Sequence, residues 1–232
     1  MTVYAVSDLH GCKHFYDRIK TVIEPEDIVY CLGDAGDRGP EPWETLKACL
    51  DDPQFIYIRG NHDEMLLEVM KNTLYQESYG PWKLHSNLQI LSYNGGYPTY
   101  EGWMSEEPDK QQEYYKKLVK TCTVALYGNP EGKRLYLSHA GGTLGKPEDW
   151  EKDSVLWNRD HFDDEWPADK ENDYVIHGHT PVDNFRQSDD ENLFDIYVYA
   201  DGHKINIDTG AKWSGRACLF NLDTMEPIYL TV

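Results

Sequence analysis

The stretch "YIRGNHDEM" at residues 57–65 begins like a buried strand and ends in polar residues that a strand does not require. The preceding "QFIYI" is mainly apolar, Gly60 and Asn61 interrupt the pattern, and apolar residues then recur at helical spacing. Asn61 and His62 are therefore expected at the carboxyl end of a strand. In open α/β sheets, ligands bind at that edge.

The first third of the chain alternates strand and helix patterns. The segments "TVYAVSD" and "DIVYCLGD" are typical of strands, and residues 14–23 and 41–50 are typical of helices. Together with the strand before Gly60, this order predicts a parallel sheet with right-handed crossovers.

The middle of the chain, residues 74–109, is rich in Tyr, Gly, Pro and Asn and has no clean period. We predict an insertion or lid here, with short helices. Its aromatic residues are expected to pack in the core or the lid, with stacking on a substrate as the alternative; they include Trp82, Tyr93, Tyr97 and Trp103.

The second half of the chain is expected to contain more strands than helices. A helix is predicted over residues 110–125, followed by the strands "RLYLSHA" and "YVIHGHT" with an acidic, Trp-rich loop at residues 141–173 between them. Short strands cut by Asp-Gly and Gly then predict antiparallel structure. The whole chain, residues 1–232, is predicted to be one α/β domain with a β-rich carboxyl-terminal third.

The composition excludes several classes of protein. Asp and Glu number 41 against 22 Lys and Arg, and the net charge of −19 disfavours binding to long nucleic acids and anionic membranes. The five cysteines are scattered and never in CxxC spacing, which favours free thiols in a reducing compartment over disulfides or a thiolate zinc site. Without a signal-like or membrane-spanning apolar run, we expect a cytoplasmic protein.

Five polar motifs follow predicted strands: "SDLHG", "GDAGDRG", "RGNHD", "LSHAGG" and "HGHTP". Asp, Asn and His are ligands that suit manganese, iron and zinc. Six candidate ligands exceed the coordination sphere of one ion once waters are added, so two ions are expected; the candidates are Asp8, His10, Asp34, Asn61, His139 and His179.

This ordered set of motifs resembles the calcineurin-like metallophosphoesterases, and within them the bacterial and phage serine/threonine protein phosphatases. The resemblance runs from Asp8 to about Gly210, near "INIDTGA". It implies a four-layer αββα sandwich in which two mixed sheets are flanked by helices. It also implies that two divalent ions, manganese in preference to iron or zinc, are held by Asp8 and His10 on one side, by Asn61, His139 and His179 on the other, and by Asp34 as the bridge.

The resemblance further assigns the catalytic residues. His62 matches the general acid, Asp37 the carboxylate that orients it, and Arg38 a phosphate-binding arginine, while Arg159 in "VLWNRD" resembles a second such arginine. The chemistry agrees, because a histidine held by a carboxylate can protonate a leaving alkoxide and arginine matches phosphate oxygens.

Two positions depart from the protein-phosphatase pattern. Ser7 stands where those enzymes usually have Gly, and Asp63 stands where they have Glu. Both are compatible with a metal centre but weaken a strict assignment to that group. His177, also in the fifth motif, is expected to be a core or supporting imidazole, with a ligand or substrate role as the alternative.

The leading functional hypothesis is a phosphatase acting on phosphoserine or phosphothreonine, with phosphotyrosine as a further substrate. The alternative is hydrolysis of dinucleoside polyphosphates such as diadenosine tetraphosphate, which a deep aromatic pocket from residues 74–109 would favour; a shallow, open site would favour the phosphatase. A non-catalytic scaffold would have gaps among the site residues, and every position is filled. A nuclease or cyclic-phosphodiesterase activity stays open, although the net charge disfavours long nucleic acids.

Overall fold

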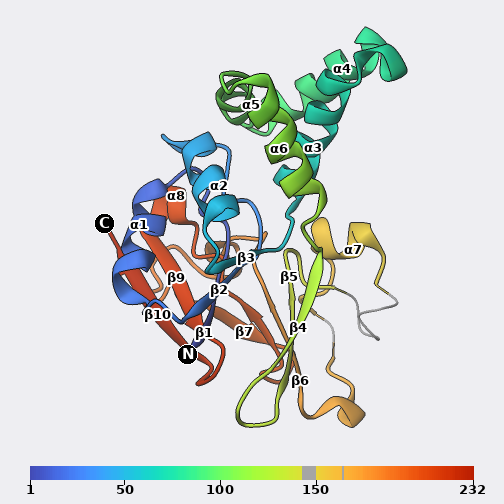
Figure 1. Cartoon of the computed structure of the whole chain (residues 1–232). Helices are drawn as coiled ribbons and strands as arrows, with labels where there is room; N and C mark the ends of the chain where they lie inside the picture. The colour runs from blue at the N-terminus through green and yellow to red at the C-terminus, as the bar shows by residue number, and fades with distance from the viewer. Residues whose placement is uncertain (143–149, 164) are drawn as a thin grey trace.

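Two five-stranded sheets form the centre of the molecule (Figure 1). The computed structural model describes residues 1–142, 150–163 and 165–232, except for the side chains of residues 76, 77 and 79. The strands of the first sheet, in spatial order, are β10 (Glu226–Thr231), β9 (Arg216–Asn221), β1 (Val3–Val6), β2 (Ile28–Cys31) and β3 (Phe55–Tyr57). Those of the second are β4 (Val124–Gly128), β5 (Arg134–Ser138), β6 (Asp173–His177), β8 (Lys204–Asn206) and β7 (Tyr197–Tyr199).

Both sheets are mixed. Strands β1, β2 and β3 pair in parallel, as predicted, and the crossovers between them contain α1 (Lys13–Val22) and α2 (Pro42–Asp51). The first sheet is nevertheless not wholly parallel, because β9 pairs antiparallel with both β1 and β10. In the second sheet β5, β6 and β8 are parallel and the edge strands β4 and β7 are antiparallel, so the antiparallel prediction is wrong for the pairing of β8 with β6.

Alternating residues of β1 divide between two hydrophobic clusters. Val3 and Ala5 lie between the sheets, in a cluster that includes Leu135 and Leu137 of the second sheet. Tyr4 belongs to the other cluster, which packs the first sheet against its helices. The sheets therefore form a sandwich with helices on the outer face of the first sheet, in agreement with the expected fold.

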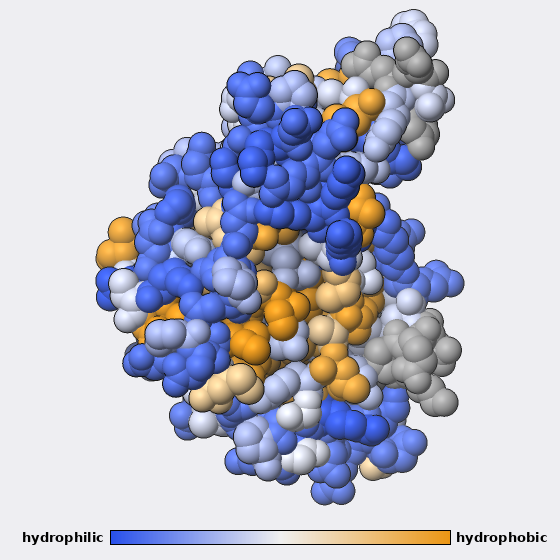
Figure 2. Space-filling model, viewed as in Figure 1, coloured by the Kyte–Doolittle hydropathy of each residue, from blue (hydrophilic) through white to orange (hydrophobic). Residues whose placement is uncertain are grey.

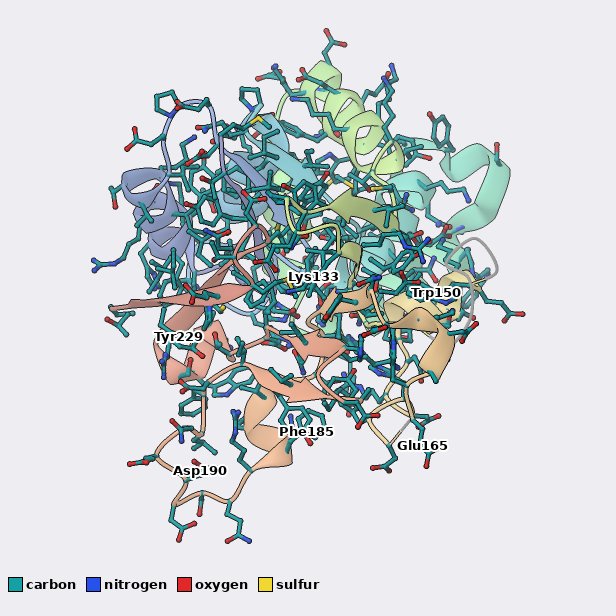
Figure 3. All side chains as sticks on the ribbon, turned by 90° about the horizontal axis from the view of Figure 1, so that it is seen from below. Lys133, Trp150, Glu165, Phe185, Asp190 and Tyr229 are labelled. Atoms are coloured by element: carbon teal, nitrogen blue, oxygen red, sulfur yellow. The ribbon has the colours of Figure 1, made fainter. Side chains whose placement is uncertain are left out.

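The outer face of the second sheet is covered by shorter elements. Phe162 packs against Tyr199 with ring centroids 4.9 Å apart and against Phe185 with centroids 4.1 Å apart. Phe185 ends the 3₁₀ helix η3 (Val182–Phe185), and Figure 3 shows Asp190 on a loop that projects beyond it. Helix α7 (Lys152–Leu156) and the 3₁₀ helix η2 (Ala168–Lys170) lie in the predicted acidic loop, of which residues 143–149 and 164 are outside the described residues.

Helices α4 (Gln76–Tyr93) and α5 (Tyr97–Met104) form what we call the helical arm, which stands above the sheets (Figure 1). In sequence the arm follows α3 (Asn61–Leu74) and precedes α6 (Pro108–Val119). The predicted short helices are thus present, although α4 is long and bends at Gly80, where φ is +73°, next to Pro81. The visible surface of the arm is mainly hydrophilic, whereas hydrophobic side chains gather below it (Figure 2). None of the helices in the described parts of the chain is both long and apolar enough to cross a membrane.

Two predictions for the segment from residue 74 to residue 125 were wrong. The helix expected over residues 110–125 ends at Val119, and β4 begins at Val124. Strand β4 lies at a sheet edge, and 58% of Leu126 is exposed. Because apolar residues are tolerated on the exposed face of this strand, its sequence lacks the alternation of apolar and polar residues that predicts a strand. Of the aromatic residues expected to pack, Trp82 is 84% exposed and Tyr93 is 93% exposed.

Trp103 is the aromatic anchor of the arm. Its side chain is fully buried, and its indole N–H donates to the carbonyl oxygen of Gln111 at 3.0 Å. Trp103→Ala should lower the free energy of unfolding by about 3–5 kcal/mol, because it removes a large buried side chain and leaves a cavity. Urea unfolding measures this, with Trp82→Ala as the exposed control; equal effects of the two changes would contradict this packing.

Candidate metal centre

All the polar motifs meet at one edge of the sandwich. Asp8 and His10 lie between β1 and α1, Asp34 follows β2, and Asn61 begins α3. From the second sheet, His139 directly follows β5 and His179 follows β6. The six candidate metal ligands are all buried, with at most 6% of each residue exposed. The structure therefore brings together all six side chains that are predicted from the sequence to be metal ligands.

The Asp34 carboxylate lies at the centre of this cluster. Its Oδ2 is 3.4 Å from Nε2 of His139 and 3.9 Å from Nε2 of His10. Its Oδ1 accepts the backbone N–H of His62 at 3.0 Å, which fixes the plane of the carboxylate. Asp34 belongs to both groups of described residues able to hold a metal ion, one with Asp8 and His139 and the other with His10 and His62.

Asp8 and His10 lie on one side of Asp34. Asp8 Oδ2 and His10 Nδ1, the atoms that face away from the cluster, are already hydrogen-bonded. His10 Nδ1 lies 3.1 Å from the carbonyl oxygen of Gly36, so Nδ1 is the donor and the lone pair of the neutral ring is on Nε2, 3.8 Å from Asp8 Oδ1. Asp8 Oδ2 accepts the hydroxyl of Ser7 and, at 2.9 Å, the backbone N–H of His179. One nitrogen and one carboxylate oxygen are thereby left facing the cluster.

On the second side, three side chains converge on one point. Asn61 Oδ1 is 2.8 Å from His139 Nε2 and 2.9 Å from His179 Nδ1, and the two ring nitrogens are 3.1 Å apart. His139 Nδ1 is 2.7 Å from the carbonyl oxygen of Leu32, which directs Nε2 into the cluster. Among the described residues, the buried Nε2 of His179 has no hydrogen-bond partner. An array of acceptors gathered around one point fits a divalent cation.

The pKa values of the buried groups reflect the charges around Asp34. Burial alone would raise the pKa of Asp34, but His139, His62 and His10 outweigh it and hold this pKa well below its usual range. Burial would lower the pKa of His139, but Asp34 and Asp8 raise it to about 10. A metal ion that binds His139 must therefore displace a proton. Burial lowers the pKa of His10 to about 3, so its ring is neutral and able to bind metal.

His62 and Asp37 form a buried pair beside the cluster. His62 Nδ1 is 2.7 Å from Asp37 Oδ2, and Asp34 and Asp37 raise the pKa of His62 even though burial opposes them. Arg38 lies with Nη1 2.9 Å from His10 Nε2 and Nη2 2.6 Å from His62 Nε2. Arg159 donates from Nη1 to Thr180 Oγ1 at 3.3 Å, which places it beside His179. A proton donor and two guanidinium groups thus adjoin the cluster.

The backbone at the site is strained. Nine non-glycine residues of the described chain have positive φ, and six of them are candidate site residues: Asp8, His10, Asp34, Asp37, Arg38 and His179. Such conformations cost about 1–3 kcal/mol each and persist where the surroundings impose them, typically at functional sites. The gathering of these conformations at six candidate site residues supports the interpretation of these loops as a candidate functional site.

Asp63 and Tyr57 have a supporting role that the sequence analysis missed. Asp63 Oδ2 accepts the backbone N–H groups of Gly60 at 2.8 Å and Asp34 at 3.0 Å, and Tyr57 donates its hydroxyl to Asp63 Oδ1 at 2.9 Å. Asp63 therefore ties the loop of Asp34 to the start of α3. The sequence signal for Asp63 was its place in the "RGNHD" motif, where the protein phosphatases have Glu. Tyr57 gave no signal, because its pattern also fits a strand interior.

His177 lies outside the cluster. It is fully buried, and its Nε2 is 2.7 Å from the hydroxyl oxygen of Tyr199. The structure thus places it in the packing behind His179, which is the first of the two interpretations given above.

Comparisons with known proteins point to one family. The family model described as calcineurin-like phosphoesterase matches residues 1–208. Serine/threonine-protein phosphatase 2 of Salmonella typhimurium is 27% identical over 95% of this chain and 92% of its own length. An asymmetrical bis(5'-nucleosyl)-tetraphosphatase, PrpE of Anoxybacillus flavithermus, is 23% identical over 96% of this chain and 91% of its own length.

The fold has a solved counterpart. The crystal structure of a protein provisionally assigned as a diadenosine tetraphosphatase superposes with a TM-score of 0.64. The superposition covers 98% of this chain and 92% of the other, with 16% sequence identity. At this identity the likeness shows the fold alone.

Proposed function

Because this chain belongs to the calcineurin-like phosphoesterases and is a metal-dependent hydrolase of phosphoesters, we propose that it dephosphorylates phosphoserine and phosphothreonine in proteins, and phosphotyrosine as a further substrate. The observation that carries this proposal is the exposure of the phosphate-binding candidates. Arg38 and Arg159 are both exposed beside the buried cluster, so a phosphate on a protein surface can reach them. The named phosphatase relative, similar over nearly the whole chain, supports the same substrate class.

The proposed ligand sets divide the cluster between two divalent ions, manganese in preference to iron or zinc. Asp8 and His10 would hold one ion, Asn61, His139 and His179 would hold the second, and Asp34 would serve both. When bound, two such ions lower the pKa of a water molecule and orient the phosphate for in-line attack. The neutral ring of His10 and the low pKa of Asp34 suit these roles.

The remaining groups handle charge and protons. Arg38 and Arg159 bind the phosphate oxygens, where their guanidinium groups gain strength as negative charge develops. Arg38 Nη2, a donor that lies 2.6 Å from His62 Nε2, turns to the phosphate, and His62 then donates a proton from Nε2 to the leaving alkoxide. Asp37 holds Nδ1 of His62 and stabilises the imidazolium. The raised pKa of His62 keeps this proton available near neutral pH.

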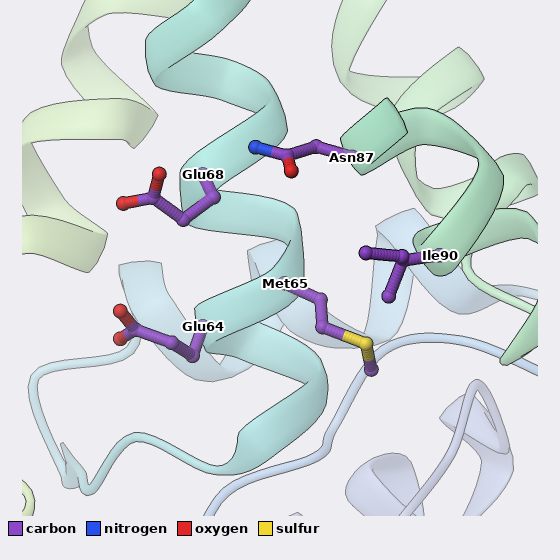
Figure 4. A pocket seen from close by; sticks show the side chains of 5 residues that line it. All are labelled: Glu64, Met65, Glu68, Asn87 and Ile90. Atoms are coloured by element: carbon purple, nitrogen blue, oxygen red, sulfur yellow. The ribbon is translucent and has the colours of Figure 1, made fainter. Parts of the chain in front are cut away.

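A dinucleoside polyphosphate is the second candidate substrate. Relatives named bis(5'-nucleosyl)-tetraphosphatases match most of the chain, at 23% and 24% identity. Trp82 and Tyr93 are almost fully exposed to solvent. None of the described residues that line the pocket between α3 and α4 is aromatic, which favours the protein substrate; they are Glu64, Met65, Glu68, Asn87 and Ile90 (Figure 4).

The compartment is also a proposal. All five cysteines are free thiols, consistent with a reducing cytoplasm. The net charge of −19 argues against long nucleic acids as substrates.

The experiment that tests the proposal compares two substrates in one assay. The manganese-reconstituted protein is given a phosphothreonine peptide and diadenosine tetraphosphate, and kcat/KM is measured for each. We expect the peptide to be preferred by at least about 10-fold, equivalent to about 1.4 kcal/mol in transition-state binding. Preference for the dinucleotide would replace the proposal with the second candidate.

A further inference from the structure

The first turn of α5 contacts the carboxylate that holds the proposed general acid. Thr99, fully buried, accepts the backbone N–H of Asp37 on Oγ1 at 3.0 Å and donates its hydroxyl hydrogen to Asp37 Oδ1. One hydroxyl thus uses both its donor and its acceptor capacity on the same residue. The second carboxylate oxygen, Oδ2, faces His62 Nδ1 at 2.7 Å. Thr99, Asp37 and His62 form a continuous buried chain.

The backbone of Asp37 needs such a constraint. Its φ of +65° is unfavourable for a residue with a side chain, and the next residue, Arg38, has a φ of +61°. The methyl group of Thr99 also lies against Gly36, where a Cβ would come within 3.2 Å of Thr99 Cγ2. Thr99 therefore holds both the backbone and the carboxylate of Asp37 in one arrangement.

The loop that joins α4 to α5 closes over the same residues. Arg38 donates its backbone N–H to the carbonyl oxygen of Gly95 at 3.0 Å. A Cβ on Gly96 would come within 2.6 Å of Asp37 Oδ2, so only glycine permits this approach. The helical arm thus contacts both catalytic candidates of the "GDAGDRG" loop.

We propose that Thr99 is a positioning residue for the general acid, acting on His62 through Asp37, so that the helical arm is part of the catalytic apparatus. The inference rests on the proposed function, in which His62 protonates the leaving group. Thr99 orients Asp37 Oδ1, which leaves Oδ2 aimed at His62 Nδ1. The opposite ring nitrogen, His62 Nε2, then faces the guanidinium of Arg38, the proposed phosphate-binding residue. Small errors in such an arrangement are costly, about 10²-fold in rate for a displacement of 1 Å.

The test is Thr99→Val, which keeps the shape and removes the hydroxyl. Substrates with a poor leaving group need the acid, whereas 4-nitrophenyl phosphate releases a stable anion and needs it little. We expect kcat/KM to fall by about 10- to 100-fold with a phosphothreonine peptide and by less than about 3-fold with 4-nitrophenyl phosphate. Metal content, measured on the same samples, should not change, because Thr99 touches none of the proposed ligands.

Three further variants serve as controls for Thr99→Val. Thr99→Ser retains the hydroxyl and should retain most of the activity. Thr45→Val removes a fully buried hydroxyl on α2 that donates to the carbonyl oxygen of Glu41, and should change the hydrolysis of neither substrate. In a His62→Asn background, Thr99→Val should cost less than about 3-fold, since the two residues act as one unit.

An equal loss with both substrates, or a full multiplicative loss in the His62→Asn background, would overturn the inference. Loss of bound metal from Thr99→Val would do the same, because it would show damage to the whole site. If the unaltered protein hydrolyses neither substrate, the proposed function fails instead. The two failures are therefore distinguishable.

Discussion

Asp34→Asn is expected to abolish phosphoester hydrolysis and metal binding together. The carboxylate is the shared member of both metal-capable groups, and its Oδ2 faces Nε2 of His10, His62 and His139. An amide keeps the shape, and its oxygen can still accept the His62 N–H that Asp34 Oδ1 accepts now. The amide lacks the negative charge of Asp34, however, and places an N–H₂ group against the ring nitrogens of these histidines. Replacing a residue outside the coordination sphere typically lowers metal affinity by about 10- to 100-fold, and Asp34→Asn should lower it by more.

The measurement for Asp34→Asn is the number of metal ions per chain after equilibration with manganese, alongside turnover. Asp173→Asn is the matched control, because Asp173 is also a buried carboxylate but pairs with Arg134. It should keep its metal and its activity. An Asp34→Asn protein that retains two ions and full turnover would rule out the bridging assignment.

His62→Asn should leave the metal in place while lowering turnover by about 10²- to 10⁴-fold, the usual range for a general acid. His62 sits between Asp37 Oδ2 at 2.7 Å and the Arg38 guanidinium, which positions Nε2 beside the proposed phosphate site. The loss should be largest for substrates with poor leaving groups. His203→Asn is the control, since His203 bonds to the carbonyl oxygen of Asp173 at the opposite end of the strands.

The pH dependence of the same variant gives a second readout. Asp34 and Asp37 raise the pKa of His62 above its ordinary value of 6.5, despite burial. The protonated ring is the active form of an acid, so kcat/KM for a poor leaving group should fall as pH rises through that raised pKa. This alkaline limb should disappear in His62→Asn. Unchanged kinetics with every substrate would reject the acid role.

The location of the site could be predicted from the sequence because parallel strands place their carboxyl ends at the same edge. Asp8, Asp34 and Asn61 follow three adjacent parallel strands, so short-range patterns were enough to bring them together. His139 and His179 required the second sheet, which the residue patterns alone did not pair with the first. The resemblance of the motifs supplied that step.

The supporting residues could not be predicted in the same way. Thr99 is 62 positions from Asp37, in a segment without a clear period, and a single threonine carries no signal of its contact. Tyr57 has the pattern of an ordinary strand residue, although its hydroxyl reaches both Asp63 and the backbone N–H of Ala35. Such roles depend on tertiary contacts, and only the folded chain reveals them.

The position of the cluster across two sheets has a consequence for how the molecule holds together. Asp8 and Asp34 extend from the first sheet and His139 and His179 from the second, and the bond from His179 N–H to Asp8 Oδ2 spans 171 positions of sequence. An ion bound by both sides is a removable cross-link between the two halves of the sandwich. It binds only the folded arrangement, so by mass action each tenfold excess over its dissociation constant adds about 1.4 kcal/mol to the free energy of unfolding. We therefore expect the supply of metal to raise the resistance of the fold to denaturation as well as the activity of the enzyme.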